Sequence, residues 1–174
     1  MAALAGMFGA FVTQNRKAGR RLGGPGARIR EILEEMEPVL EQACAAVCPG
    51  CTDVCCARAT IWYDFKDLLY LFFTGSDTGR LPGPGFPDGQ IRKVKEPGGG
   101  QTCVHLGPDG CSQPRIRRPF VCTWYLCPDQ KQWLRTQPGS METLESGLAR
   151  IKALRQEMAG LYRQKHGRER EFMV

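Results

Sequence analysis

The residues of this chain best suited to chemistry are its nine cysteines, which fall into two groups. In the first group, the stretch CPGCTDVCC (residues 48–56) holds four thiols in nine positions, and Cys44 precedes it. The spacing C-x2-C-x3-CC lets a tight turn aim several thiolates at one point, as a tetrahedral ion with metal–sulfur bonds of about 2.3 Å requires. Pro49 and Gly50 favour such a turn, because proline fixes one backbone angle and glycine permits a left-handed one. This group therefore predicts a metal site, and whether Cys44 also ligates stays open.

The second cysteine group lies in the stretch TCVHLGPDGCSQPRIRRPFVCTWYLC (residues 102–127). Cys103 and Cys111 flank a turn, and we expect Cys122 and Cys127 to lie on an aromatic-rich helix. These thiols form a second four-thiolate site or complete the first one, and the spacing does not choose between the two. In a strand, His105 would share a face with Cys103, which makes it a candidate nitrogen ligand, although a lone histidine more often has a hydrogen-bonding structural role.

Cysteine usage and hydropathy predict a cytoplasmic protein. The opening MAALAGMFGAFV is apolar, but its basic residues follow it, so it does not resemble a secretory signal. Clustered cysteines in a reducing compartment usually bind metal or react. No apolar run approaches the roughly 20 residues that span a bilayer, so no transmembrane segment is expected.

The positive charge of the chain is concentrated near its start. Residues 1–30 hold six Lys or Arg and no acidic residue, whereas residues 31–174 hold 18 of each sign. We expect residues 1–26 to form a basic, flexible leader, because Gly19, Gly23, Gly24, Pro25 and Gly26 separate them from the next segment. Such a leader is most simply a solvated segment, but it could also bind a polyanion or an acidic face of a protein partner.

The rest of the sequence predicts a small, mainly helical α+β domain. A helix is expected over residues 27–47, kinked or divided at Pro38, and a short buried helix over residues 64–75, capped by Asp64. Glycine and proline make residues 75–90 a loop, and two short strands around the turn PGGG predict a β-hairpin.

A long amphipathic helix is expected at the end of the chain, over residues 140–167. Its apolar residues recur every three or four positions, which predicts a core face. The sequence thus divides into a cysteine-cluster domain over residues 27–139, this helix packed on the same domain, and a polar tail over residues 168–174.

Several of these motifs occur together in a known family. The chain has a cysteine cluster ending in CC, then C-x-H-L from Cys103 to Leu106, a Gly-Cys turn at Cys111, and Arg118-Pro119 before Cys122. In this combination it resembles the YkgJ-like cysteine-cluster proteins, which are described as zinc- or iron-chelating domains. The resemblance covers residues 44–127. It departs from the family at the first motif, which is usually C-x2-C-x2-CC, and in the additional Cys44 and Cys127.

The resemblance implies which residues bind the metal. With Cys127 added as the last thiol of the second group, the expected ligands are Cys48, Cys51, Cys55, Cys56, Cys103, Cys111, Cys122 and Cys127. Arg118 and Pro119 would hold the chain that presents Cys122, and an arginine there would offset the negative charge of the thiolates.

Three functional classes are open to such a domain. The first is a metal-binding protein that holds zinc, iron or an iron–sulfur cluster. The second is an iron–sulfur redox enzyme or electron carrier, because the flagellin lysine N-methylases carry a similar cluster. The third is a zinc module that binds nucleic acid through its basic tail. No catalytic constellation is identifiable apart from a redox-active metal centre, so the sequence leaves open whether the protein is an enzyme.

Overall fold

A computed structural model describes residues 16–51, 55, 61–74, 93–95, 101–107 and 110–166 of the chain. Helices account for most of this structure, which confirms the prediction of a mainly helical domain. The elements are α2 (Arg16–Val47), the 3-10 turn η1 (Cys48–Gly50), α4 (Phe65–Phe73), β1 (Lys93–Lys95), β2 (Gln101–Cys103), β3 (Leu106–Gly107), β4 (Gly110–Cys111), the 3-10 turn η3 (Arg115–Arg117), α5 (Val121–Trp124), α6 (Pro128–Thr136) and α7 (Ser140–His166).

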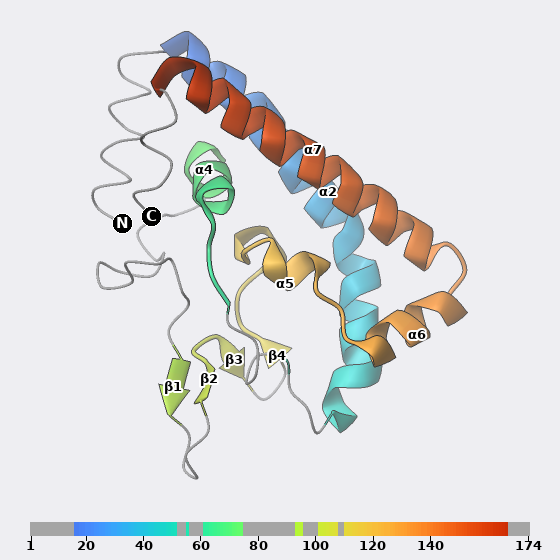
Figure 1. Ribbon diagram of the computed structural model, residues 1–174. Helices are drawn as coiled ribbons and strands as arrows, with labels where there is room; N and C mark the ends of the chain where they lie inside the picture. The colour runs from blue at the N-terminus through green and yellow to red at the C-terminus, as the bar shows by residue number, and fades with distance from the viewer. Residues whose placement is uncertain are drawn as a thin grey trace.

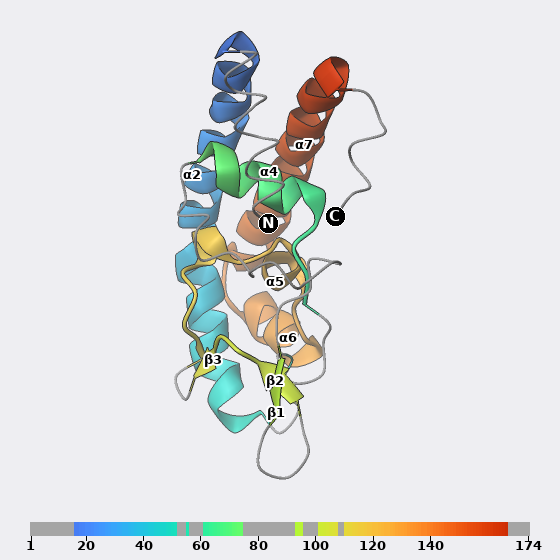
Figure 2. The same ribbon diagram turned by 90° about the vertical axis from the view of Figure 1, so that its left-hand side faces the viewer.

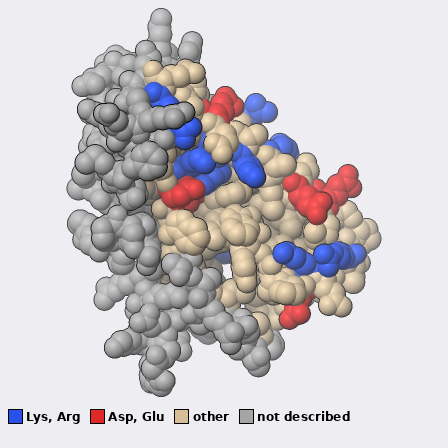
Figure 3. Space-filling model, viewed as in Figure 1, with Lys and Arg blue, Asp and Glu red and all other residues tan. Residues whose placement is uncertain are grey.

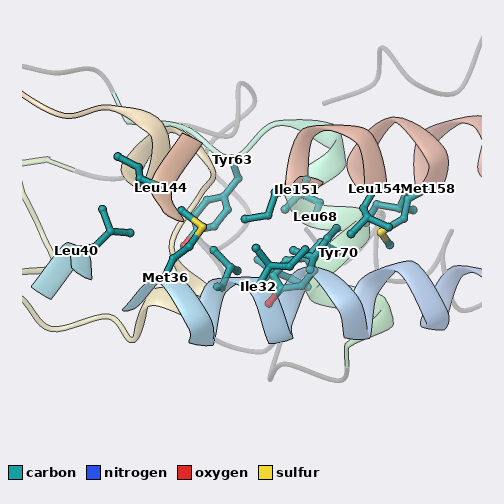
Figure 4. Packing of buried hydrophobic residues seen from close by; sticks show 14 of the residues in the cluster. Ile32, Met36, Leu40, Tyr63, Leu68, Tyr70, Leu144, Ile151, Leu154 and Met158 are labelled. Carbon is teal, nitrogen blue, oxygen red and sulfur yellow. The ribbon is translucent and has the colours of Figure 1, made fainter. Parts of the chain in front are cut away.

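The two long helices, α2 and α7, lie side by side and α4 crosses them on one side (Figures 1 and 2). The apolar positions of α2 that recur at helical spacing, among them Ile32 and Met36, are buried against α7. Ile151 and Met158 belong to the matching stripe of α7, and Figure 4 shows the two stripes facing each other. The core of the domain therefore lies between these helices and α4, and α7 has the position that the sequence predicted.

Helix α2 differs from its prediction in extent. It spans Arg16–Val47 and runs through both Pro25 and Pro38, where the sequence predicted a break and a kink or division. Each proline removes one helical N–H, but Leu22 is fully buried and Gly26 packs closely against the Thr74 side chain. Tertiary packing therefore outweighs the local cost, and residues 16–26 of the expected leader are helical. Residues 1–15 of that leader lie outside the described residues.

Helix α4 begins where its expected cap predicted. The Asp64 carboxylate accepts a hydrogen bond from the Asp67 backbone N–H (2.8 Å), and Asp67 accepts one from the Asp64 N–H (3.0 Å). Arg155 of α7 donates to both carboxylates and lies over the Phe120 ring, 4.5 Å from its centroid. The backbone N–H of Phe120 also donates to Asp67 (3.0 Å). One buried arginine thus connects α7, the start of α4 and the segment before α5.

Four short strands form two antiparallel pairs beside the helices (Figure 1). In the first pair Lys95 faces Gln101 across the stretch where the sequence predicted a hairpin, and in the second Gly107 faces Gly110. The expected loop over residues 75–90 and the polar tail over residues 168–174 lie outside the described residues. Within the described part of the chain, no helix has the combined length and apolar character that crossing a membrane requires.

Candidate thiol site

Three thiols contact one residue, Gln130, where the end of α2 approaches the start of α6. Cys44 lies in the last turns of α2, Cys48 opens η1, and Cys127 immediately precedes α6. The side-chain amide nitrogen of Gln130, in α6, lies 3.5 Å from the Cys44 sulfur and 3.5 Å from the Cys48 sulfur. The backbone N–H of Gln130 donates to the Cys127 sulfur at 3.4 Å. A single buried residue therefore contacts three sulfurs from two distant parts of the sequence.

Cys127 occupies the N-cap of α6, and this explains its position. Its sulfur accepts the Gln130 N–H while its own backbone N–H donates to Gln130 Oε1 at 3.2 Å, which forms a capping box with Pro128 at the first helical position. The prediction that Cys122 and Cys127 share one helix is therefore wrong, because only Cys122 lies on α5.

The thiols of this group influence one another electrostatically. The pKa of Cys48 is raised to about 12, first by partial burial, then by the charge of Cys44 and a hydrogen bond with it, and then by the charges of Cys55 and Cys127. Each thiolate formed here makes the next one less favourable. A bound cation would reverse this effect, because metal binding stabilises the deprotonated sulfur.

A second set of thiols acts electrostatically on Tyr63. Burial and the charge of Asp67 raise the pKa of this phenol, and the charges of Cys122, Cys111 and Cys103 raise it further. These cysteines come from α5, β4 and β2, and the Tyr63 hydroxyl donates to the Arg117 carbonyl at 2.9 Å. The grouping of the cysteines in space therefore differs from their grouping in the sequence, because Cys127 lies with Cys44 and Cys48 and not with Cys122.

Two arginines fix the segment that leads to Cys122. Arg118 donates to the Gln113 carbonyl at 2.8 Å, and its guanidinium also lies 3.6 Å from Glu41 of α2. Arg115, which is almost fully buried, donates to the same Glu41 carboxylate at 2.6 Å. These contacts tie the stretch before α5 to α2, in the part of that helix that precedes Cys44.

The other candidate ligands have different surroundings. The backbone N–H of Cys51 donates to the Cys48 carbonyl at 3.1 Å, and Cys56 lies outside the described residues. The His105 ring nitrogen Nδ1 lies 3.3 Å from the amide nitrogen of Gln113, and burial lowers the pKa of this imidazole. Ligation by Cys51 or His105 stays a prediction.

Neither a disulfide nor a preformed metal cage links the described cysteines. The eight that the structure describes are all outside disulfides. In the same part of the chain, no three or more His, Cys, Asp or Glu side chains are arranged so that they would hold a metal ion as they stand. The cysteines thus do not form one cluster, and a metal would have to draw the sulfurs together.

Gln130 is the functional candidate that the sequence did not indicate. The one local signal was the pattern Cys-Pro-Asp-Gln from Cys127 to Gln130, because a cap residue followed three positions later by glutamine predicts a helix start. That signal predicts α6 and the contact between Cys127 and Gln130. It does not predict that the same glutamine reaches Cys44 and Cys48, which depends on how α6 packs against α2.

Comparison with known proteins adds no assignment to this geometry. No family model, curated protein or solved structure matches this chain.

Proposed function

We propose that this protein binds zinc or iron through cysteine thiolates, as a small domain organised around metal. The observation that supports the proposal is that thiols from two distant segments all contact one buried residue, Gln130. Cys44 and Cys48 are 86 and 82 positions from Gln130 in the sequence, yet both sulfurs contact its amide. Thiols that gather in this way outside disulfides are typical of thiolate metal sites.

The surroundings suit the negative charge that such a site accumulates. Cys127 lies at a helix N-terminus, and Arg115 and Arg118 lie in the segment tied to α2 next to Cys44. Away from the thiols, Lys and Arg are interspersed with Asp and Glu on the described face that Figure 3 shows. That mixture does not favour a nucleic-acid interface on this face.

Metal content after anaerobic purification tests the proposal. We expect zinc or iron in stoichiometric amount by elemental analysis, and the absorption spectrum distinguishes the two forms. A colourless protein with zinc indicates a closed thiolate site, whereas visible charge-transfer absorption with iron indicates an iron–sulfur cluster and supports the redox alternative. A metal-free protein whose cysteines are paired in disulfides would contradict the proposal.

Replacement of one thiol near Tyr63 connects metal binding to folding. We expect Cys111→Ser to lower metal content and melting temperature together, because a metal site that forms only on folding contributes its binding free energy to stability. Ser112→Ala is the matched control, since its neighbouring hydroxyl donates to the His105 carbonyl and no sulfur is lost. Full metal content with unchanged melting in Cys111→Ser would exclude Cys111 as a ligand.

A further inference from the structure

We propose that Cys44, Cys48 and Cys127 ligate one metal ion of their own, separate from a centre that contains Cys103, Cys111 and Cys122, and that Gln130 positions their sulfurs. This inference rests on the proposed metal-binding function and specifies its ligands. It adds Cys44, whose role the sequence left open, and it moves Cys127 out of the group to which its place in the sequence assigned it.

The sulfurs of Cys44 and Cys48 lie near the same side-chain nitrogen. Cys44 lies in the last turn of α2 and Cys48 opens η1 directly after that helix, four residues further along the chain, so the two lie on neighbouring turns. Each sulfur is 3.5 Å from the same nitrogen, so the two lie within twice that distance of each other. Zinc–sulfur bonds of about 2.3 Å require ligand sulfurs closer than about 4.6 Å. The Cys44 and Cys48 thiols also share a hydrogen bond, so these two sulfurs already lie close to each other.

The Gln130 amide is oriented with its nitrogen toward the sulfurs. Its oxygen already accepts the Cys127 backbone N–H, so its NH2 group must face the Cys44 and Cys48 sulfurs. Together with its own backbone N–H on Cys127, this residue directs N–H donors at three sulfurs. Such donors bind a thiolate more strongly than a thiol, and hydrogen bonds to ligand sulfurs are a usual outer contact of metal sites.

Metal counting in single and paired variants tests the separation of the two centres. Purified full-length protein is loaded with Zn²⁺ and analysed for metal per chain. We expect Cys44→Ser and Cys127→Ser each to remove one equivalent and retain the other, Cys103→Ser to remove the other equivalent, and the Cys44→Ser/Cys103→Ser pair to remove both. If either single replacement releases all metal, the thiols share one centre and the separation is wrong.

The same variants distinguish failure of this ligand assignment from failure of the proposed metal-binding function. Wild-type protein that holds metal, with Cys44→Ser and Cys127→Ser unchanged in content, would overturn the ligand assignment and leave the metal-binding function in place. A wild-type protein without metal would overturn both. In each single variant, the equivalent of metal that is retained reports that the domain is still folded.

The role of Gln130 is tested by affinity. We expect Gln130→Leu to weaken Zn²⁺ binding at the first centre by about 10- to 100-fold in competition with a chelator, because it removes the side-chain donors to Cys44 and Cys48. Gln132→Leu, at an exposed position of the same helix, is the matched control and should leave affinity unchanged. Equal affinities in the two variants would overturn the positioning role. The number of sulfur ligands, read from the charge-transfer absorption of the Co²⁺-loaded protein, should stay the same in both.

Discussion

At the level of single residues, Arg155 is the buried charge on which the packing of α4 depends most. Its guanidinium is almost fully buried and pairs with Asp67, which is buried as well, and with Asp64 at 2.7 Å. Burial raises the pKa of Asp67 to about 6, and the charge of Arg155 opposes that rise. Removing the arginine would therefore leave Asp67 buried without its counter-ion.

We expect Arg155→Leu to lower the free energy of unfolding by about 3–5 kcal/mol, the usual cost when one partner of a buried ion pair is removed. Arg150→Leu on the same helix is the matched control, because Arg150 pairs with Glu35 at 3.1 Å and both side chains are more than half exposed. Exposed pairs contribute about 1 kcal/mol at most. Urea unfolding of the two variants at neutral pH measures both changes in the free energy of unfolding. Similar decreases in the two variants would show that the buried Arg155 pair contributes no more than an exposed ion pair.

The residue types of the candidate site could be predicted from the sequence, but their grouping could not. The spacing of the cysteines predicted metal ligands, and that prediction stands untested. Which thiols face one another depends on the packing of α6 against α2, because this contact brings Cys127 to Cys44 and Cys48. No local pattern contains that information, so the sequence grouped Cys127 with Cys122 instead.

At the level of elements, the contact between α2 and α7 is tight at Gly147. A Cβ built on Gly147 would lie 2.8 Å from Met36 Cγ and would also overlap the Met36 sulfur. Met36 is almost completely buried, so it has little room to move aside. The absence of a side chain at Gly147 thus allows these two helices to approach.

We expect Gly147→Ala to destabilise the protein by about 1–3 kcal/mol, because the added methyl group overpacks the contact with Met36. Gly160→Ala is the matched control on the same helix, since nothing lies within 4 Å of its added Cβ. There the higher helix propensity of alanine should stabilise the protein by up to about 1 kcal/mol. Thermal unfolding shows whether each variant is destabilised or stabilised. Stabilisation by Gly147→Ala would show that the two helices can move apart at little cost in free energy.

The elements that the sequence predicted well are those with strong local signals. Asp64 and the apolar stripe of residues 140–167 identified α4 and α7 without any tertiary information. The start of α2 was predicted wrongly because glycine and proline disfavour a helix locally, whereas burial of Leu22 favours it only in the packed domain. Helix α6 was missed because it buries Leu134 and Gln130 but has no long apolar stripe.

At the level of the whole molecule, α2 connects two regions with different roles. Leu22 is packed in the core near the first turns of the helix, while Cys44 lies near its other end. At about 1.5 Å per residue these positions are about 33 Å apart along the helix axis. The packing of the first turns and the candidate thiol site should therefore be separable by experiment.

We expect deletion of residues 1–26 to lower the melting temperature and to leave metal content unchanged. The deletion removes the buried Leu22, whereas the thiol site at the other end of α2 keeps its contacts with α6. Leu22→Ala in the full chain is the matched control and should cost about 2–5 kcal/mol, also without loss of metal. Elemental analysis beside thermal unfolding separates the two effects. Loss of metal in the deletion alone would mean that residues 1–26 support the thiol site by a route other than Leu22, whereas loss in both variants would mean that packing at the first turns of α2 controls the geometry at Cys44.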